Sequence, residues 1–424
     1  MTANYKRKSG RDRISNLPEH LIASIIERLP IQDAVRTCII SKKWRYIWTE
    51  MRKLVFDNKF SNKFAKNGAF GGFISIIKQV LTLSKGPILK FSKNGAFGSN
   101  EFISIVNQVL TLHKGPILKF HLHIPNIFLD SFEEVDQSML LLSRTGVREL
   151  ILDSSNRCYE LPSYVFSCLE LTRLILYNCF FNPPLKFEGF LNLEELILRH
   201  IDFGANLCGT KINLPRLKNL SLGYCKNVYN LKIKATNLFR LAITACPDAM
   251  LATMLSNSKV KRFCIDAQFL KTLTPENIPK WLQQPDNSLR YLWFRKFHLV
   301  DVDQLRGALC LLRNSPNIKT LGMYLEKLFQ KPRVNIGPAS SILESLNCLD
   351  YKLYQLQNVV ITSIEGSKPE MLFIKLLLSH SPSLEKVTIR PSGSSSVQER
   401  LDIAKDVMWF PRASPKAKII YSNP

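Results

Sequence analysis

The chain has 424 residues, about three times the usual length of a single domain, so we expect several structural units or one elongated repeat array. Hydrophobic residues make up 46% and charged residues 22%, a composition that excludes a disordered or collagen-like chain. The 58 Lys and Arg residues against 34 Asp and Glu leave a net charge of +24, which favours anionic partners or acidic protein surfaces.

The N-terminal residues and the cysteines indicate the compartment. Basic residues crowd positions 6–13 without an apolar stretch behind them, so we expect no secretory signal peptide. No apolar run approaches the roughly 18 residues of a membrane span, so we expect none. The 10 cysteines include no CxxC pair and no Cys/His cluster, which predicts reduced thiols and no metal in a cytoplasmic and/or nuclear protein.

Residues 17–51 carry apolar side chains at helical spacing and predict a small helical module. Pro18 suits a first helical turn, and Pro30 ends the helix. The apolar stripe predicted for this helix comprises Ile22, Ile25, Ile26 and Leu29. A second short helix follows, and Ser41 can begin a third in which Trp44 and Trp48 share a face. So short a module has a small core, so we expect part of its apolar surface to bind a partner.

Residues 66–120 contain a tandem duplication. KNGAFGGFISIIKQVLTLSKGPILKF, from Lys66, is followed by KNGAFGSNEFISIVNQVLTLHKGPILKF, from Lys93. Each copy predicts an amphipathic helix, a Gly-Pro turn and a strand. The extra copy could be an added binding module. We favour the other interpretation, that it is a recent duplication or a sequence-model artefact without a function of its own.

From residue 147 the motif LxxLxL recurs and predicts a repeat array. It begins at residues 147, 171, 193, 217 and 238, and weaker units begin at 260, 289, 318 and 384. Spacings of 21 to 24 residues between the first five fall in the range of leucine-rich repeats, in which each unit supplies one strand to a curved parallel sheet. Cys179, Cys225 and Cys246 share one phase of the repeat, which predicts buried structural thiols.

Three segments together resemble one plant protein family. LPEHLIASIIERLPIQDAVRTCIISKKWRYIW, from Leu17, resembles an F-box. The residues that carry this match are Leu17, Pro18, Ile25, Leu29, Pro30, Ala34, Val35, Ser41, Lys43, Trp44 and Trp48. LQNVVITSIEGSKPEMLFIKLLLSHSPSLEKVTIR, from Leu356, is similar to the FBD domain of plant F-box/leucine-rich-repeat proteins. NQVLTLHKGPILKFHLHIP is similar to the segment that joins F-box to repeats in that family, where one copy is the norm.

The resemblance implies an α/β protein with a three-helix F-box, a curved leucine-rich-repeat solenoid with a parallel sheet, and a C-terminal FBD region. The boundaries that we predict are 1–12 for a basic tail, 13–60 for the F-box, 61–146 for the duplicated linker segment and the start of the repeats, 147–345 for the leucine-rich repeats and 346–424 for the FBD domain.

The resemblance also implies a function, that of a substrate-receptor subunit of an SCF-type ubiquitin ligase. The F-box would dock on the Skp-type linker protein, which joins it to cullin and RING subunits, and this chain would catalyse nothing. By resemblance, the Skp-binding residues are Leu17, Pro18, Ile25, Leu29, Pro30 and Trp44. The alternatives are a leucine-rich-repeat scaffold outside any ligase and a basic nucleic-acid-associated protein.

The motifs give little support to an enzymatic, metal-binding or nucleic-acid-binding function. The sequence has no GxxxxGK[ST], GxSxG, HExxH or GxGxxG motif, so we predict no catalytic residue and no cofactor. His121 and His123 would share a strand face and could bind a metal, but no further Cys or His stands near them, so we favour an exposed or packing role. The tract YKRKSGRDR could contact phosphates, yet no nucleic-acid-binding signature accompanies it, so a nucleic-acid partner is not favoured.

The repeat strands also indicate where a protein substrate would bind. In an LxxLxL strand the leucines point inward and the intervening residues face the concave side. Aromatic residues and Arg are enriched among binding hot spots. The candidate substrate-binding residues are therefore Tyr177, Arg199, Tyr291, Trp293 and Arg295. Trp293 could alternatively pack beneath the C-terminal region.

Overall fold

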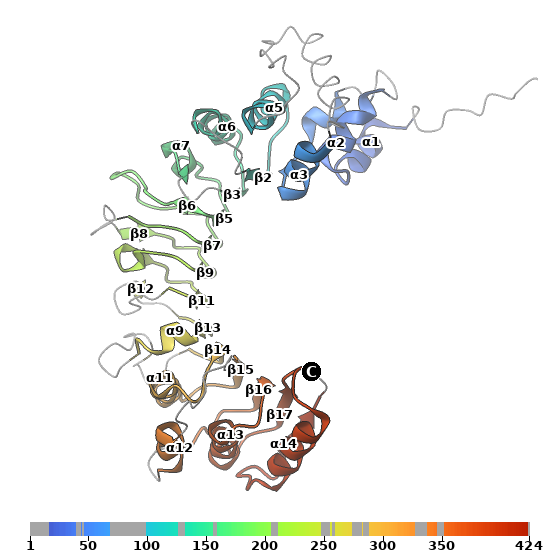
Figure 1. Ribbon diagram of the computed structural model, residues 1–424. Coiled ribbons are helices and arrows are strands. Elements are labelled where there is room, and N and C mark those ends of the chain that lie inside the picture. Colours follow the sequence, from blue (N-terminus) through green and yellow to red (C-terminus); the bar gives the residue numbers. More distant parts are fainter. Residues whose placement is uncertain are drawn as a thin grey trace, which may run out of the picture. The chain divides into compact units, whose positions relative to one another are not determined.

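The computed structural model describes most of the chain (Figure 1). The described residues are 17–39, 44, 46–67, 99–125, 132–155, 159–204, 211–246, 255–256, 259–273, 282, 288–326, 337–345 and 352–422. The chain forms two compact units, Met1–Cys179 and Phe180–Pro424. The first copy of the duplication, residues 66–92, lies almost wholly outside the described residues.

The first unit begins with the short helices of the N-terminal module. These are α1 (Glu19–Ile26), α2 (Ile31–Arg36), η1 (Thr37–Ile39) and η2 (Ile47–Glu50). Pro18 and Pro30 are the residues immediately before α1 and α2, as their fixed φ angle allows. Ser41, the predicted start of a third helix, lies outside the described residues, and the part described around Trp48 is a single 3-10 turn.

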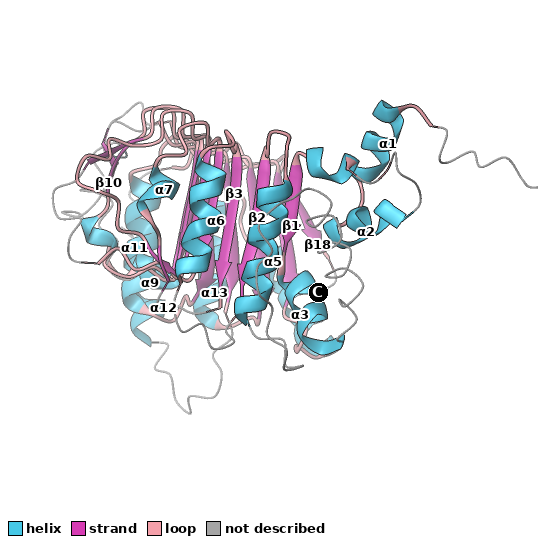
Figure 2. Cartoon of the chain, turned by 90° about the horizontal axis from the view of Figure 1, so that it is seen from above, coloured by secondary structure: helices cyan, strands magenta, loops and turns pink. Residues whose placement is uncertain are grey.

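The rest of the first unit alternates strands and helices. Its elements are β1 (Lys53–Phe56), α3 (Asn58–Asn67), α5 (Ser99–Leu112), β2 (Lys119–Ile124), α6 (Glu133–Ser143), β3 (Glu149–Ser154), β4 (Tyr159–Glu160), α7 (Ser163–Phe166) and β5 (Arg173–Tyr177). Strands β1, β2, β3 and β5 pair in parallel in that order. Helices α5 and α6 lie on one face of β2 and β3 (Figure 2). The helix and strand predicted for the second copy of the duplication are thus confirmed.

The second unit is built around a parallel sheet of nine strands among its described residues. In order of pairing they are β7 (Glu195–Arg199), β9 (Asn219–Gly223), β11 (Arg240–Thr244), β13 (Arg262–Asp266), β14 (Tyr291–Phe297), β15 (Thr320–Leu325), β16 (Asn358–Ile364), β17 (Lys386–Pro391) and β18 (Lys418–Tyr421). Each of the LxxLxL motifs from 193 to 384 supplies one of these strands, which confirms the repeat prediction. The leucine positions are buried and the intervening positions are more exposed, as in β7 and β11.

The elements that pack behind the nine-stranded sheet differ between the early and the later repeats. Behind the early repeats lies a second parallel sheet of β8 (Lys211–Asn213), β10 (Lys232–Lys234) and β12 (Leu255–Ser256). The later repeats have helices there, namely α9 (Ala267–Leu270), α11 (Val302–Arg313), α12 (Gly337–Glu344), α13 (Lys368–His380) and α14 (Val397–Trp409). Strands β16, β17 and β18 fall in the predicted FBD region and continue the same sheet, so this region extends the repeat fold.

A recurring turn ends the strands. Asn178, His200, Tyr224 and Ala245 each have φ near +50°, a left-handed conformation that non-glycine residues rarely adopt. Each lies directly after a strand, and in three repeats the next residue is one of the phased cysteines. Cys179, Cys225 and Cys246 are at most 1% exposed, so the prediction of buried structural thiols is confirmed. None of these four left-handed positions is a glycine, so the sequence did not predict the left-handed turn.

Candidate functional site

The N-terminal module divides its apolar residues between a core and an exposed side. Ile22 and Ile26 of α1 are fully buried, whereas Leu21 and Ile25 are 44% and 41% exposed. These two exposed residues are four apart and share one face of the helix. Ile25 belongs to the predicted apolar stripe, but at 100° per residue it stands at the border of the stripe and turns outward, where a partner can reach it. Leu21 was missed by the sequence analysis, although its spacing from Ile25 was the available signal.

The other residues predicted to bind a linker protein differ in accessibility. Pro18 and Pro30 are exposed, and Leu17 and Leu29 are half-buried. Trp44 is only 3% exposed and belongs to the core of the module with Trp48. Among the described residues of this module, Pro18, Leu21, Ile25 and Pro30 are exposed apolar residues on or beside α1 and α2, and Tyr46 is a further exposed ring, while Trp44 supports the module from within.

The second copy of the duplication joins the helical module to the first sheet. The amides of Lys114 and Gly115 donate to the carbonyl of Thr49, at 2.8 and 3.4 Å, and the amides of Leu118 and Lys119 donate to Arg52 at 2.8 and 3.0 Å. A Cβ at Gly115 would lie only 3.1 Å from the Cα of Glu50, so this close approach favours glycine. The turn HKGP of the second copy thus connects the helical module to the first sheet.

A pocket of about 860 Å³ opens on the exposed face of the second unit's sheet. Its lining residues come from β11, β13, β14 and β15 and are Arg240, Arg262, Phe263, Cys264, Tyr291, Leu292, Trp293, Arg295, Lys296, Thr320 and Tyr324. Three predicted substrate-binding residues, Tyr291, Trp293 and Arg295, therefore line one pocket. Cations and aromatic rings dominate its rim, and no carboxylate is among the described lining residues.

The floor of the pocket is shaped by a contact between neighbouring strands. Trp293 of β14 pairs in register with Gly322 of β15 and with Cys264 of β13. A Cβ at Gly322 would overlap the six-membered ring of Trp293, so the indole lies flat over the glycine backbone. Trp293 is half-buried by this packing on the open face of the sheet. The small residues on both sides of Trp293 leave the hollow that the larger rim residues surround.

Tyr177 and Arg199 stand outside the lining of this pocket. Tyr177 ends β5 in the first unit and is half-buried. Arg199 ends β7 in the second unit, and its side chain lies over Gly223 of the neighbouring strand, where a Cβ would be 3.4 Å from its Cγ. Both residues occupy the face of the sheet on which they were predicted, and their role in substrate binding stays a prediction.

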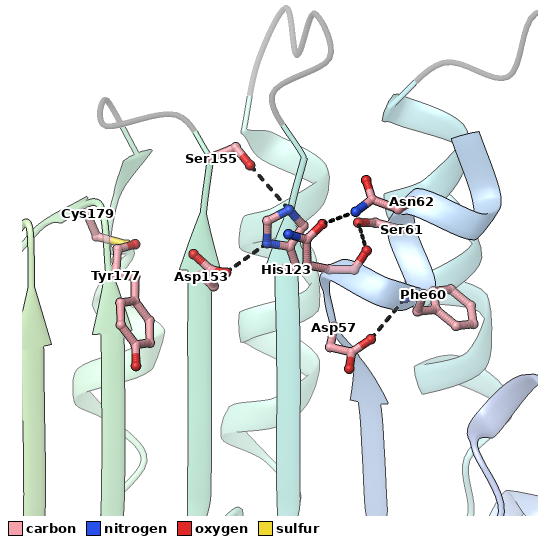
Figure 3. A network of polar contacts seen from close by, with 10 residues as sticks. Asp57, Phe60, Ser61, Asn62, His123, Asp153, Ser155, Tyr177 and Cys179 are labelled. Carbon is pink, nitrogen blue, oxygen red and sulfur yellow. Dashed lines mark hydrogen bonds and ion pairs between the residues drawn. The ribbon is translucent and has the colours of Figure 1, made fainter. Parts of the chain in front are cut away.

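A polar network in the first unit contains a Ser, a His and an Asp (Figure 3). His123 Nδ1 lies 2.9 Å from Asp153 Oδ2, and His123 Nε2 lies 3.2 Å from Ser155 Oγ. This is the order of acyl-transfer triads, but that chemistry also needs oxyanion donors and a substrate pocket. The pocket described above is lined by residues of the other unit. We interpret the network as a polar tie between β2 and β3, in agreement with the packing role predicted for His123.

Metal binding and membrane insertion find no site in the described ranges. No group of three or more His, Cys, Asp or Glu side chains there is arranged to hold a metal ion. Within the same ranges, every helix is too short or too polar to span a bilayer. His121 shares the strand face of His123, and burial lowers the pKa of its imidazole.

Comparisons with known proteins agree with this architecture. Residues 14–56 match the F-box domain family. An F-box/FBD/LRR-repeat protein of Arabidopsis thaliana is 30% identical over 97% of this chain and 98% of its own length. A putative F-box/LRR-repeat protein of the same plant is 23% identical, with 98% of each chain covered. A putative FBD-associated F-box protein, also from Arabidopsis thaliana, is 23% identical over 90% of this chain and 97% of its own length.

Proposed function

Because this chain belongs to the F-box/FBD/LRR-repeat family, we propose that it is a substrate-receptor subunit of an SCF-type ubiquitin ligase. Its F-box binds a Skp-type linker protein, which connects it to cullin and RING subunits, and its repeat sheet recruits a protein substrate. The chain itself supplies proximity, because ubiquitin transfer is carried out by a recruited enzyme. The free thiols fit the cytoplasmic and/or nuclear setting that this function requires.

The observation that carries this proposal is the exposed apolar surface of the F-box. Leu21 and Ile25 stand side by side on α1 and keep 44% and 41% of their surfaces exposed, and exposed apolar groups of this kind mark protein interaction sites. Pro18 and Pro30 add apolar surface at the starts of α1 and α2. In the linker interface, Leu17 and Leu29 contribute their exposed parts and Trp44 holds the helices in place.

The substrate surface is the second element of the proposal. Tyr291, Trp293 and Arg295 line a pocket on the face of the sheet that is open to solvent. Aromatic residues and Arg provide the largest share of binding free energy in protein interfaces. Tyr177 and Arg199 are further candidates for substrate contact.

Affinity purification of the full chain tests the linker interface. We expect the wild-type chain to recover Skp-type and cullin subunits, and Leu21→Glu with Ile25→Glu to abolish their recovery, because two carboxylates would lie in an apolar interface. Leu17→Ala with Pro18→Ala should act in the same direction. Leu185→Glu is the matched control, since Leu185 is 93% exposed in the second unit.

Two results would contradict the proposal. If the wild-type chain recovered neither Skp-type nor cullin subunits, it would be a repeat scaffold outside any ligase. If recovery were unchanged in Leu21→Glu with Ile25→Glu, the exposed face of α1 would not be the docking surface. Recovery of nucleic acid that is lost at high salt would instead favour the basic nucleic-acid-associated alternative.

A further inference from the structure

The pocket around Trp293 has a charge and shape that define the kind of substrate segment it accepts. We propose that it binds an extended acidic segment of a protein partner, in which two carboxylates flank one apolar side chain. This inference rests on the proposed function, because the partner would be the recruited substrate.

The arginines of the pocket are not balanced by acidic side chains among the described residues. Within the described residues, no carboxylate lies at ion-pair distance from Arg240, Arg262 or Arg295. Asp266 pairs in register with Arg295, but its carboxylate accepts hydrogen bonds from the amides of Ala245 and Phe269. Among the described residues, Lys296 is the one cation of the pocket with a carboxylate at ion-pair distance, that of Glu326 at 3.9 Å. An anionic partner would therefore supply the negative charge that the arginines of the pocket lack.

Arg262 gives the sharpest sign of a missing acceptor. Its guanidinium carbon lies 4.5 Å from the centre of the Tyr291 ring, and its Nε atom is buried without a hydrogen-bond partner among the described residues. Stacking on an aromatic ring leaves the edge of a guanidinium available for a carboxylate. A buried donor without an acceptor is destabilising, and a bound carboxylate would supply the missing acceptor.

The arrangement of the cations sets the spacing of the segment. Arg262 pairs in register with Tyr291, whereas Arg295 lies four residues further along the same strand. At about 3.3 Å per residue, the backbone positions of the two arginines are about 13 Å apart along the strand direction. In an extended chain, residues i and i+4 have the same separation and point to the same side, and residue i+2 lies between them. The acidic residues therefore occupy i and i+4, and the apolar residue at i+2 packs on Trp293.

The size of the pocket also favours an extended segment over a single side chain. A volume of about 860 Å³ lies near the upper end of the roughly 300–1,000 Å³ that is usual for ligand sites. The exposed rings of Tyr291 and Tyr324, which are 40% and 47% accessible, extend the contact surface beyond the floor. A peptide bound along the strands can cover both.

Isothermal titration calorimetry of the full chain with short peptides tests this proposal. The probe is Gly-Glu-Ser-Phe-Ser-Glu-Gly, acetylated and amidated so that only its two carboxylates are charged. We expect micromolar binding that weakens at least about tenfold when both Glu become Gln, because charge-assisted hydrogen bonds are lost. Replacement of Phe by Ser, or the order Gly-Glu-Glu-Phe-Ser-Ser-Gly, should also weaken binding.

Variants locate the binding site. Arg262→Gln and Arg295→Gln should each weaken binding of the Glu peptide by about tenfold and leave the residual binding less sensitive to salt. Arg306→Gln, on the exposed side of α11, is the matched control and should bind as the wild type does. Arg262→Lys keeps the charge and should restore part of the affinity. Thermal unfolding confirms that each variant is folded, and Arg295→Gln carries the test if Arg262→Gln is not.

Several outcomes would overturn the inference. Equal binding of the Glu and Gln peptides, or of wild type and both arginine variants, would show that the carboxylates do not enter this pocket. Displacement of the peptide by equimolar phenylacetate would indicate a pocket for small organic anions. If the peptides fail to bind while Skp-type subunits still co-purify, this inference fails and the proposed function stands.

Discussion

The Nε2 atom of His113 lies 2.7 Å from the carbonyl oxygen of Met51, and this hydrogen bond connects the residue after α5 to the residue after η2. The neutral ring can donate through Nε2. Burial lowers the pKa of His113 below its ordinary value of 6.5, and the hydrogen bond to Met51 opposes this effect more weakly. The joint between F-box and first sheet therefore depends on a histidine that folding keeps neutral.

Acidification should lower the free energy of unfolding of the first unit. Because the pKa of His113 is lower in the folded state than in the unfolded state, the unfolded chain binds more protons below pH 6.5. The free energy of unfolding should thus be highest above pH 6.5 and fall as the pH drops toward the folded pKa. His121 contributes in the same direction, since burial lowers its pKa too.

The variant His113→Gln tests this dependence. Its amide can still donate to Met51 but does not titrate, so the loss of stability between about pH 7.5 and about pH 5.5 should shrink, at a cost of about 1 kcal/mol or less at neutral pH. Urea unfolding followed by circular dichroism measures both effects. His20→Gln, at an exposed position of α1, should keep the full pH dependence. An unchanged dependence in His113→Gln would remove this histidine as the cause.

Gly322→Ala should destabilise the second unit through Trp293. The added methyl overlaps the indole ring, and such overpacking typically costs about 1–3 kcal/mol. In a Trp293→Ala background the same substitution should cost much less, because the ring that it meets is gone. Urea unfolding of the single and double variants forms the cycle that measures this coupling. Additive effects would show that the ring does not rest on Gly322.

Removal of residues 66–92 should leave the fold intact. The deletion joins Ala65 to Lys93, so that Lys93 and Asn94 take the places of Lys66 and Asn67 at the end of α3. The turn that contacts Thr49 and Arg52 belongs to the second copy and is retained. Soluble yield, melting temperature and recovery of Skp-type subunits should equal or exceed those of the full chain. An insoluble product would show that the extra copy is structural.

The phased cysteines should resist alkylation until the protein unfolds. Burial raises the pKa of Cys179 to about 12, and the thiolate is the reactive form. Because Cys179, Cys225 and Cys246 are at most 1% exposed, all three should remain unmodified by iodoacetamide in native protein and react fully in urea, as measured by mass spectrometry of peptides. Cys264 is the internal comparison, because it is half-buried in the lining of the pocket. Fast native modification of Cys225 would contradict the buried assignment.

The sequence alone determined the order of modules and the strands of the repeat array. The F-box match depends on a fixed spacing of Leu17, Pro18, Pro30 and Trp44, and an LxxLxL motif marks its own strand because alternate side chains must face opposite sides. Both signals are local and survive without knowledge of distant residues. The hot-spot preference of aromatic and cationic side chains was also sufficient to single out Tyr291, Trp293 and Arg295.

Only the tertiary structure decided how these residues act together. Trp293 and Gly322 are 29 positions apart, and strand register alone brings the ring over the glycine and opens the pocket beside it. The same holds for Arg262, whose stacking on Tyr291 joins two different repeats. Ile25 turned outward because a residue at the border of a helical stripe is buried or exposed according to what packs against the helix. Contacts between repeats and between helices depend on residues far apart in the chain, and no local pattern records them.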